Sequence, residues 1–235
     1  MDKKELIYEG KAKKVFATDD KDKLITEFKD DATAFNGEKK GQIMDKGQLN
    51  AEISTIFFNL LEERGIPTHL VEKLNKTDLL VKRLEIIPLE VVMRNIAAGS
   101  LVQRLGIEEG REMNQPVLEF YYKDDDLGDP LINEYHIFAE ELCSKEDLKQ
   151  IKKLAFKINN ILFDFLSDRD IDLVDFKLEF GIAGKGEIYL GDEISPDTCR
   201  FWDSKTKQKL DKDRFRRDLG QVEGAYHEIL KRIGD

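Results

Sequence analysis

The stretch Leu173–Gly181, reading LVDFKLEFG, contains the residues whose types and spacing are best suited to chemistry. Successive side chains of a strand point to opposite faces, so Asp175, Lys177 and Glu179 share one face and apolar side chains occupy the other. The apolar face can enter a core while the other face presents a carboxylate, an ammonium group and a second carboxylate. Such a row can belong to a functional site, although the solvated side of an antiparallel sheet has the same pattern and, taken alone, is the more common case.

A second strand is expected to pair with this one. Gly181–Gly186 reads as a turn, and Glu187–Leu190 reads as a strand that leads into Asp192. A hairpin of these two strands would bring Asp192 to the charged side of the first strand. The pattern leaves the register open by a residue or two.

The amino-terminal part of the chain reads as short strands, with candidates at Glu5–Tyr8, Lys14–Ala17 and Leu24–Phe28. The first connection contains Gly10, which permits a tight turn, and Lys11 and Lys13, which place two ammonium groups on one small loop. Such a loop can cover the oxygens of a di- or triphosphate. Taken alone, however, an ordinary hairpin tip with solvated lysines is the more common arrangement. The chain contains neither a P-loop nor a dinucleotide-binding glycine pattern.

Residues 86–100 run from an apolar strand into a turn of small residues. Arg94 falls at the end of the strand, and its planar fork is suited to carboxylate or phosphate. Ser100 begins a short helix, where it can cap the helix or help to hold an anion. A buried structural arginine followed by a routine cap is an equally good interpretation of these residues.

The elements that must position these residues follow from hydrophobic periodicity. Helices are expected at Leu49–Arg64, Leu101–Leu105, from Ser144 to about Asp168, and from about Asp211 onward. Further strands are expected at His69–Lys73, Asp78–Leu84 and Leu89–Met93. Ser144 with Asp147 is a capping pair for the long helix.

The last helix begins with a high density of cations, namely Lys212, Arg214, Arg216 and Arg217. Cations at a helix amino terminus oppose the helix dipole, which indicates a nearby anion. The preceding segment Ser195–Asp203 reads as a loop containing Arg200. Lys123–Asp126 is an acidic run that can form a metal loop, although such runs are typically solvent-facing turns.

Composition narrows the function classes. The chain has 235 residues, a formal net charge of −10, and two cysteines, Cys143 and Cys199. The cysteine content excludes a disulfide framework and favours a reducing, cytoplasmic location. Without a basic stripe, binding of nucleic acid is not expected. No apolar run is long enough to span a bilayer, so no membrane partner is expected. Three scattered histidines do not favour a histidine-rich zinc site.

Together these segments resemble the SAICAR synthetase family, phosphoribosylaminoimidazole-succinocarboxamide synthase, over essentially the whole chain. The two most specific motifs are PLEVVMRNIAAGS at Pro88–Ser100 and LVDFKLEFG at Leu173–Gly181. Shorter segments of the same kind are Tyr8–Lys13, Gly191–Glu193, Ser195–Asp197 and Asp211–Arg216. Two long motifs in the right order are far more specific than a single glycine pattern.

The resemblance implies a ligation that depends on ATP and Mg²⁺. The carboxylate of carboxyaminoimidazole ribotide (CAIR) attacks the γ-phosphate to give an acyl phosphate, and the amine of L-aspartate displaces phosphate to give the amide SAICAR. Phosphorylation supplies the leaving group that a carboxylate lacks, and the transfer itself requires positioning and charge neutralisation.

The resemblance also implies roles for individual residues. Lys177 is expected to stabilise charge on the reacting carboxylate or acyl phosphate, and Asp175 to orient the substrate or Lys177. Glu179 and Asp192 are expected to hold magnesium. ATP is expected to meet these two carboxylates together with Gly10, Lys11, Ala12, Lys13, Lys82, Leu84 and Lys123. CAIR is expected to bind to Arg94, Ser100, Asp197 and Arg200, and L-aspartate to Arg216 or Lys212.

The expected fold is α+β in two lobes with a nucleotide cleft between them. Residues 1–84 form an antiparallel, β-rich lobe, and residues 85–235 form a mixed lobe that carries the metal and substrate sites. A homodimer is common for enzymes of this size and is our expectation for the oligomeric state. Two alternatives stay open: a small-molecule kinase that stops at phosphoryl transfer, and a non-catalytic ATP sensor.

Overall fold

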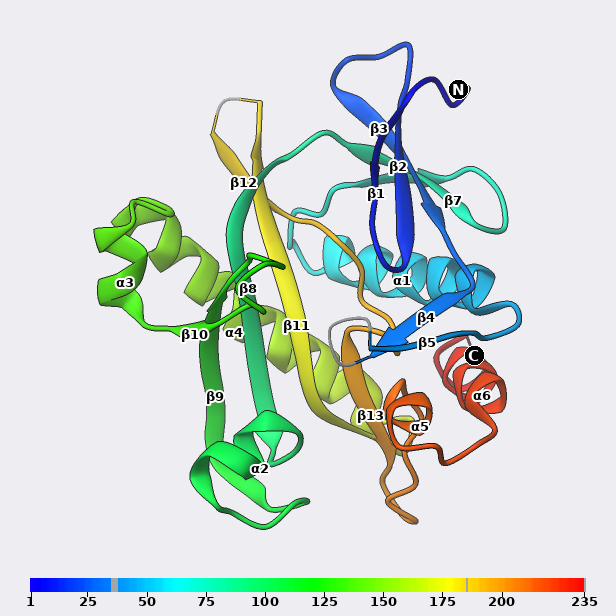
Figure 1. Ribbon diagram of the computed structural model, residues 1–235, viewed down its shortest axis with the longest axis vertical. Coiled ribbons are helices and arrows are strands. Elements are labelled where there is room, and N and C mark those ends of the chain that lie inside the picture. The colour runs from blue at the N-terminus through cyan, green and yellow to red at the C-terminus, as the bar shows by residue number, and fades with distance from the viewer. Residues whose placement is uncertain (35–37, 185, 235) are drawn as a thin grey trace.

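The computed structural model describes residues 1–34, 38–184 and 186–234, and its fold is α+β (Figure 1). A first antiparallel sheet has the order β1 (Leu6–Glu9), β2 (Lys13–Ala17), β3 (Lys23–Phe28), β7 (Asp78–Lys82) and β6 (Leu70–Lys73). A separate hairpin pairs β4 (Asp31–Ala34) with β5 (Lys39–Gln42). The strands expected near the amino terminus are therefore confirmed, with bounds shifted by one residue.

The second sheet holds both long motifs. Its order is β10 (Leu131–Ile132), β9 (Glu112–Tyr122), β8 (Glu85–Ile96), β11 (Ile171–Ala183) and β12 (Glu187–Leu190). β13 (Cys199–Asp203) pairs with the first half of β11. Because β11 pairs with β8, the two motifs lie on neighbouring antiparallel strands, with Asp175 opposite Arg94 and Glu179 opposite Glu90.

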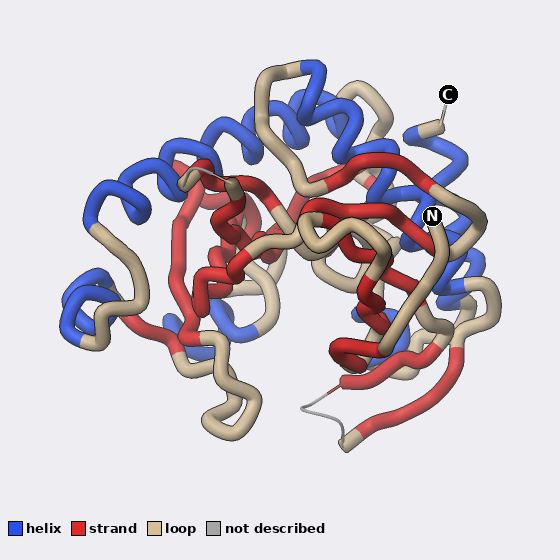
Figure 2. The backbone as a smooth tube through the Cα atoms, turned by 90° about the horizontal axis from the view of Figure 1, so that it is seen from above, coloured by secondary structure: helices blue, strands red, loops and turns tan. Residues whose placement is uncertain are grey.

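The two longest helices lie along one side of the strands in the view from above (Figure 2). The helices are α1 (Lys46–Glu63), α2 (Ser100–Leu105), α3 (Glu134–Ala139), α4 (Lys145–Ser167), α5 (Asp213–Arg216) and α6 (Val222–Ile233). The predicted cap of α4 is confirmed, since the Ser144 hydroxyl accepts from the Asp147 N–H at 3.0 Å. None of the described helices is long and apolar enough to cross a membrane.

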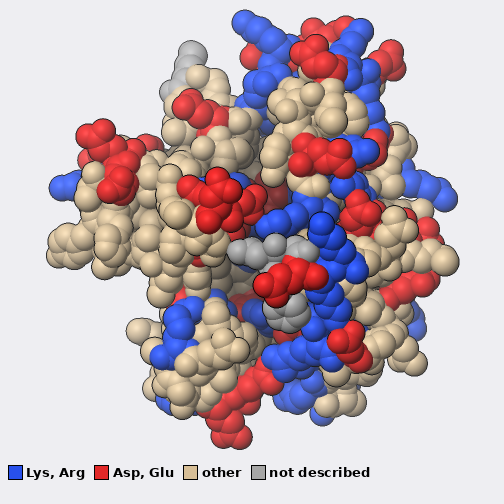
Figure 3. All heavy atoms as spheres, viewed as in Figure 1, with Lys and Arg blue, Asp and Glu red and all other residues tan. Residues whose placement is uncertain are grey.

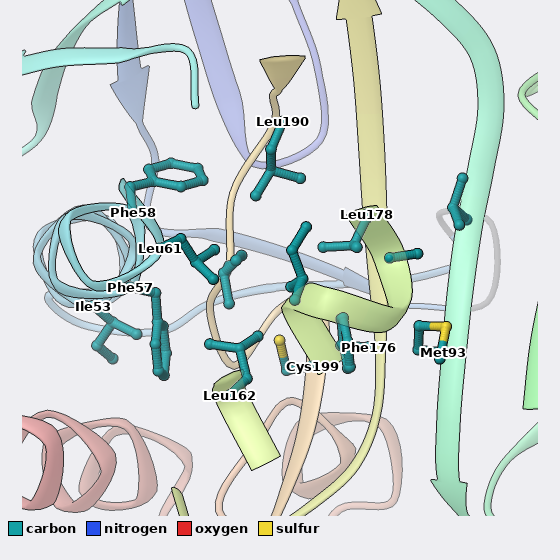
Figure 4. Close-up of a cluster of buried hydrophobic side chains, with 14 of the residues drawn as sticks. Ile53, Phe57, Phe58, Leu61, Met93, Leu162, Phe176, Leu178, Leu190 and Cys199 are labelled. Atoms are coloured by element: carbon teal, nitrogen blue, oxygen red, sulfur yellow. The ribbon is translucent and has the colours of Figure 1, made fainter. Parts of the chain in front are cut away.

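The core lies between α1, α4 and the second sheet (Figure 4). Phe176, Leu178 and Phe180 are each 1% exposed, which confirms that the apolar face of β11 is buried. Burying each of these side chains stabilises the fold by roughly 1.5–3 kcal/mol. Phe57 on α1 stacks on Phe201 of β13, with ring centroids 6.1 Å apart. The core packing on the apolar face of β11 thus holds in place the strand that carries Asp175, Lys177 and Glu179.

One continuous hydrophobic cluster includes residues from both sheets and from α1, α4 and α6. Strands β1 to β3, β6 and β7 belong to one sheet and β8 to the other, so the chain passes between sheets at Arg83 and Leu84. This crossing matches the expected position of a lobe boundary. The division into lobes at residues 84 and 85 stays a prediction, because the core is shared.

Two expected boundaries around the hairpin were wrong. The turn expected at Gly181–Gly186 starts later, because Gly181 pairs with Tyr189 and the β11–β12 ladder continues to Ala183. Lys185, within that turn, lies outside the described residues. The Ser195–Asp203 segment is not all loop, since Cys199–Asp203 forms β13 and buries Cys199 and Phe201.

The single helix expected from about Asp211 was also wrong. The structure has a short α5 and a separate α6, and between them Asp218, Gly220 and Gln221 have positive φ values of 55°, 68° and 49°. Residues with left-handed backbone cannot continue an α-helix, so the helix ends before Asp218. The helical spacing of apolar residues continues in the sequence across this break.

Candidate functional site

A cavity of about 600 Å³ lies between the two sheets and is lined by all of the predicted nucleotide residues. Its lining includes Gly10, Lys11, Ala12, Lys13, Lys82, Leu84, Lys123, Lys177, Glu179 and Asp192. In the space-filling view a hollow on this face has lysine and arginine atoms along one rim and acidic atoms along the other (Figure 3). Glu179 and Asp192, whose proximity the metal hypothesis requires, therefore face one cavity.

Lys177 is the centre of a network of carboxylates. Its Nζ lies 2.6 Å from Glu179 Oε1, 2.8 Å from Glu90 Oε1 and 3.8 Å from Asp192 Oδ2. The strand register explains this arrangement, because Glu90 and Glu179 lie directly opposite one another on β8 and β11. Like charges in that position repel, and the ammonium group between them offsets the repulsion.

Two further lysines reach the same carboxylates, one from the start of β2 and one from the loop after β9. Lys13 forms an ion pair with Asp192 and lies 3.0 Å from Glu193 Oε1, while Lys123 Nζ lies 2.9 Å from Glu179 Oε1. Lys11 is different, since it reaches across the cavity mouth to Asp125 at 2.8 Å in an exposed pair. The turn before β2 and the start of that strand thus contribute one exposed and one half-buried ammonium group, those of Lys11 and Lys13.

The network keeps its groups charged. Burial alone would lower the pKa of Lys177, but the charges of Glu179 and Asp192 outweigh it and raise the pKa well above its usual value. Burial likewise opposes ionisation of Asp192, yet Lys13 and Lys177 hold its pKa well below the usual range. The two ion types stabilise each other in a low-dielectric site.

The donor set of this network fits a magnesium ion. Its acids offer only carboxylate oxygens, the ligands that Mg²⁺ prefers, and Mg²⁺ usually takes one or two protein carboxylates together with phosphate and water. In the described residues no three His, Cys, Asp or Glu side chains are arranged as a complete metal site.

A second cavity of about 390 Å³ adjoins the first and contains the predicted substrate residues. Its lining includes Arg94, Ser100, Asp175, Asp197, Arg200 and Arg216. The residues that line both cavities are Glu90, Asp129, Lys177, Asp197 and Thr198. Lys177 therefore stands where the contents of the two cavities would meet.

Arg94 is fixed on several sides. Its Nε donates to Glu119 at 2.7 Å, one terminal nitrogen donates to Asp175 at 2.7 Å, and the other donates to the Ser100 hydroxyl at 3.2 Å. Ser100 does not cap α2, because Gly99 is the residue before the helix and no side-chain cap is formed. Of the two interpretations of Ser100, the cap was wrong and the polar cluster with Arg94 is present.

Arg200 is held in a single orientation. One terminal nitrogen donates to both oxygens of Asp175, at 3.0 and 2.9 Å, and Nε donates to Asp213 at 3.0 Å. The guanidinium lies over the backbone of Gly99, where a Cβ would come within 2.6 Å of Arg200. Gly99 also has a φ of +55°. Glycine at this position admits the close approach of the arginine.

Asp197 is not free to act as the structure stands. Its carboxylate lies 2.8 Å from Lys46 Nζ and 3.3 Å from Lys212 Nζ, and it accepts from the Tyr226 hydroxyl at 2.7 Å. With a side-chain exposure of 2%, it is a buried partner of cations rather than an open ligand group. Arg216 pairs with Asp213 at 2.6 Å, so carboxylates are the anions near the cations of α5.

Lys82 and Leu84 lie at the crossing between sheets, as expected. The Lys82 ammonium points to the carbonyl oxygens of Thr68 and Leu70, at 3.0 and 3.3 Å. Leu84 packs closely against β11, because a Cβ on Gly181 would come within 2.8 Å of the Leu84 Cβ. This segment presents backbone groups and the apolar side chain of Leu84 to the cavity.

Several residues of the site were not predicted. Glu90 lies within the motif at Pro88–Ser100, and the alternation of side chains along β8 could have predicted that it faces the cavity. Glu119, Lys46 and Tyr226 reach the site through contacts with residues distant in the sequence. His69 also lines the larger cavity, and burial, followed by the charge of Lys13, lowers its pKa to about 3. Its imidazole is therefore neutral.

A cleft between two sheets that brings lysines, arginines and carboxylates to ion-pair distance is typical of a site for anionic ligands. Comparison with known proteins makes the class specific. The family model described as SAICAR synthetase matches residues 6–233. This chain therefore belongs to the SAICAR synthetase family.

Individual relatives agree over the full length. A phosphoribosylaminoimidazole-succinocarboxamide synthase of Caldanaerobacter subterraneus subsp. tengcongensis is 61% identical, covering 99% of both chains. The crystal structure of the enzyme so named from Ehrlichia chaffeensis has a TM-score of 0.96 at 46% identity, with 98% of each chain covered. A structure titled SAICAR synthetase (Type-2) in complex with ADP has a TM-score of 0.94 at 55% identity, with 97% of each covered.

Proposed function

We propose that this chain is an ATP-dependent ligase of purine biosynthesis that joins L-aspartate to the carboxylate of CAIR through an acyl phosphate, giving SAICAR, ADP and phosphate. One observation carries the proposal beyond family membership: two cavities of different chemistry meet at Lys177. A phosphoryl donor in one and an acid in the other would lie side by side, which is what the first step requires.

The larger cavity is the nucleotide site in this proposal. The backbone of Gly10–Lys13 and the ammonium groups of Lys13 and Lys123 neutralise the phosphates, while Lys82 and Leu84 border the base. A relative of known structure was solved with ADP, which supports this use of the cleft. Glu179 and Asp192 would hold Mg²⁺, which supplies charge neutralisation on the transferring phosphoryl group.

The smaller cavity takes CAIR. Arg94, Ser100 and Arg200 offer donors to its phosphate, and their carboxylate partners hold the arginines ready before the ligand arrives. Lys177 stabilises the carboxylate that becomes phosphorylated, and Asp175 keeps Arg94 and Arg200 in place. Donors that are already fixed need not reorganise as charge moves in the transition state, and they therefore stabilise the transition state.

The test is an incubation of the protein with ATP, Mg²⁺, CAIR and L-aspartate while SAICAR absorbance is followed. Formation of SAICAR that requires all four supports the ligase. Release of ADP that does not depend on aspartate and gives no amide would favour the small-molecule kinase. Binding of ATP without turnover would favour the sensor, which has little need for Asp175, Lys177, Arg94 and Arg200 together.

Location and assembly follow from the same proposal. A purine-pathway ligase with two free thiols, Cys143 and Cys199, is expected in the cytoplasm. The oligomeric state is proposed to be a homodimer, which light scattering during size-exclusion chromatography would test.

A further inference from the structure

Glu193 is a buried carboxylate to which the proposed function gives no role. It directly follows Asp192 in the segment between β12 and β13, and its side chain is 3% exposed. Its Oε1 lies 3.0 Å from Lys13 Nζ, and its Oε2 accepts from the Ser195 hydroxyl at 2.7 Å. Protein groups thus occupy both oxygens of this carboxylate.

The Ser195 side of this contact is itself fixed. The Ser195 hydroxyl accepts from the Asp197 N–H at 3.1 Å, and the Thr198 hydroxyl donates to the Glu193 carbonyl at 3.2 Å. The Thr198 carbonyl in turn accepts from the Lys177 N–H of β11 at 2.9 Å. Buried polar groups that satisfy one another in this way form a rigid network. Glu193 is therefore anchored to the second sheet.

Lys13, the partner of Glu193, belongs to the first sheet. It begins β2, and its ammonium group also forms an ion pair with Asp192. Burial alone would lower the pKa of Lys13, but the charges of Asp192 and Glu193 outweigh burial and raise it above its usual value. The contact between Glu193 and Lys13 thus joins two charged groups from different sheets, both of which line the larger cavity.

The two acidic partners of Lys13 are not equivalent. In the proposed function Asp192 holds the metal, so a lysine held by Asp192 alone would compete with the metal for that carboxylate. Glu193 has one oxygen bound to Ser195 and the other bound to Lys13, and it is almost fully buried. It is therefore poorly placed as a metal ligand and well placed as a fixed partner for the lysine.

We propose that Glu193 is a positioning residue that fixes the Lys13 ammonium group for the nucleotide phosphates and leaves Asp192 to the metal, while Ser195 fixes Glu193. The inference rests on the proposed function, in which Lys13 neutralises phosphate. A lysine that is already held in place need not be ordered when the nucleotide binds, and this favours binding.

Loss of the Glu193 charge distinguishes this role from a simple charge effect. Removing a negative charge beside a phosphate site would by itself strengthen the binding of an anion. If Glu193 holds Lys13 in place, its loss instead weakens binding, because the ammonium group is then free to turn to Asp192. Glu193→Gln is the matched variant, since glutamine has nearly the same shape and keeps an oxygen for the Ser195 hydroxyl.

The test is a double-mutant cycle on the binding of ADP, measured by isothermal titration calorimetry in the presence of Mg²⁺. Glu193→Gln should raise the Kd for ADP about tenfold, since a charge-assisted contact that orders Lys13 is lost. In the Lys13→Met background the same substitution should change the Kd by less than about twofold, because Glu193 acts through the lysine. In the ligation, the KM for ATP should rise while the KM values for CAIR and L-aspartate stay within about twofold.

Two further variants sharpen the experiment. Ser195→Ala should weaken ADP binding in the same direction by a smaller factor, and it serves if Glu193→Gln folds poorly. Ser54→Ala is the control for a structural loss in the same segment, because the buried Ser54 hydroxyl donates to the Ile194 carbonyl at 3.1 Å. It should lower the midpoint of thermal unfolding and leave the Kd for ADP within about twofold.

Three results would overturn the inference: unchanged or tighter ADP binding in Glu193→Gln, an equal effect of that substitution in the Lys13→Met background, or an equal rise in Kd in Ser54→Ala. A loss of ADP affinity that additional Mg²⁺ restores in both backgrounds would also overturn it, because Glu193 would then be a metal ligand. A failure of the proposed function looks different, because the parent protein would form no SAICAR while the cycle on ADP binding still reports the coupling of Glu193 to Lys13.

Discussion

The half of the cleft around Lys177 and the half around Arg200 use the same residue types in opposite proportions. Around Lys177, the carboxylates Glu90, Glu179, Asp192 and Glu193 pair with the ammonium groups of Lys13, Lys123 and Lys177. Around Arg200, the cations Arg94, Arg104, Arg200 and Arg216 pair with Glu119, Asp175 and Asp213. The first half has an excess of negative charge and the second an excess of positive charge.

The difference shows what each half lacks. An acidic network with lysines between its carboxylates can accept a divalent cation and a polyphosphate together. The carboxylates hold the cation, and the cation and the lysines neutralise the polyphosphate. A basic network with its arginines already oriented accepts anions directly. One cleft can thus sort its ligands by charge. Single substitutions can alter one half at a time.

The largest effect is expected from Asp192→Asn. The substitution removes a carboxylate from the proposed metal site, and SAICAR formation should therefore fall by about 10³-fold or more. Rates are measured by SAICAR absorbance, and circular dichroism checks the fold. Asp19→Asn is the control, because Asp19 is 67% exposed and pairs with Lys4. A near-normal kcat in Asp192→Asn would mean that the metal site is misplaced.

Arg200→Met should have the next largest effect, and on the other half alone. Loss of one charge-assisted donor to CAIR is expected to raise the KM for CAIR by about 10- to 100-fold, with the KM for ATP little changed. Steady-state kinetics with each substrate varied in turn give both values. Arg64→Met, which removes an exposed arginine after α1, is the control. A comparable rise in the KM for ATP would show that the two halves do not act separately.

Gly99→Ala tests whether the orientation of Arg200 matters. The new Cβ would lie 2.6 Å from the guanidinium, at a residue with φ +55°, so the arginine must move and the backbone is strained. The KM for CAIR should rise by about tenfold, with stability reduced by about 1–3 kcal/mol. Gly106→Ala is a useful comparison, because its φ is +62° and it has nothing within 4 Å. Should both variants change the KM for CAIR equally, the close approach would be irrelevant.

The smallest expected effect concerns pH and Asp211, which lies behind the basic half. Burial, followed by the charge of Asp213, raises the pKa of Asp211 to about 7. The folded state then keeps a proton that the unfolded chain releases, so this residue's contribution to stability falls as pH rises from about 4 to 7. Asp192, with its depressed pKa, contributes no such change in that range.

Urea unfolding of the parent protein and of Asp211→Asn at pH 5, 6, 7 and 8 measures this contribution. The free energy of unfolding of the variant relative to the parent should rise by at least about 1 kcal/mol between pH 5 and 8. A constant difference would contradict the assignment of a raised pKa to Asp211.

Local pattern predicted the parts of the site that lie on one strand. The alternation in Leu173–Gly181 predicted the buried face of β11 and the row Asp175, Lys177 and Glu179, because strand geometry fixes which side chains share a face. The hairpin placed Asp192 near Lys177 for the same reason. Helix periodicity likewise predicted α1 and α4, although α1 starts earlier than expected.

Contacts between distant elements were beyond the reach of such patterns. Lys46 meets Asp197 only because α1 packs beside the loop before β13, and no spacing in the sequence encodes that approach. β9 was missed because its first four residues, Glu112–Gln115, are mostly polar and only one residue of the whole strand is buried. The break between α5 and α6 was missed because left-handed residues such as Asp218 and Gln221 do not interrupt an apolar period.

The central claim is that the acid of one substrate is activated by phosphorylation before the amine attacks, and oxygen transfer tests it most directly. CAIR labelled with ¹⁸O in both oxygens of its carboxylate is converted with ATP and L-aspartate, and the released phosphate is analysed by mass spectrometry. The account predicts one ¹⁸O in the phosphate for each SAICAR formed, because that oxygen bridges carbon and phosphorus in the acyl phosphate. SAICAR formed together with unlabelled phosphate would contradict it.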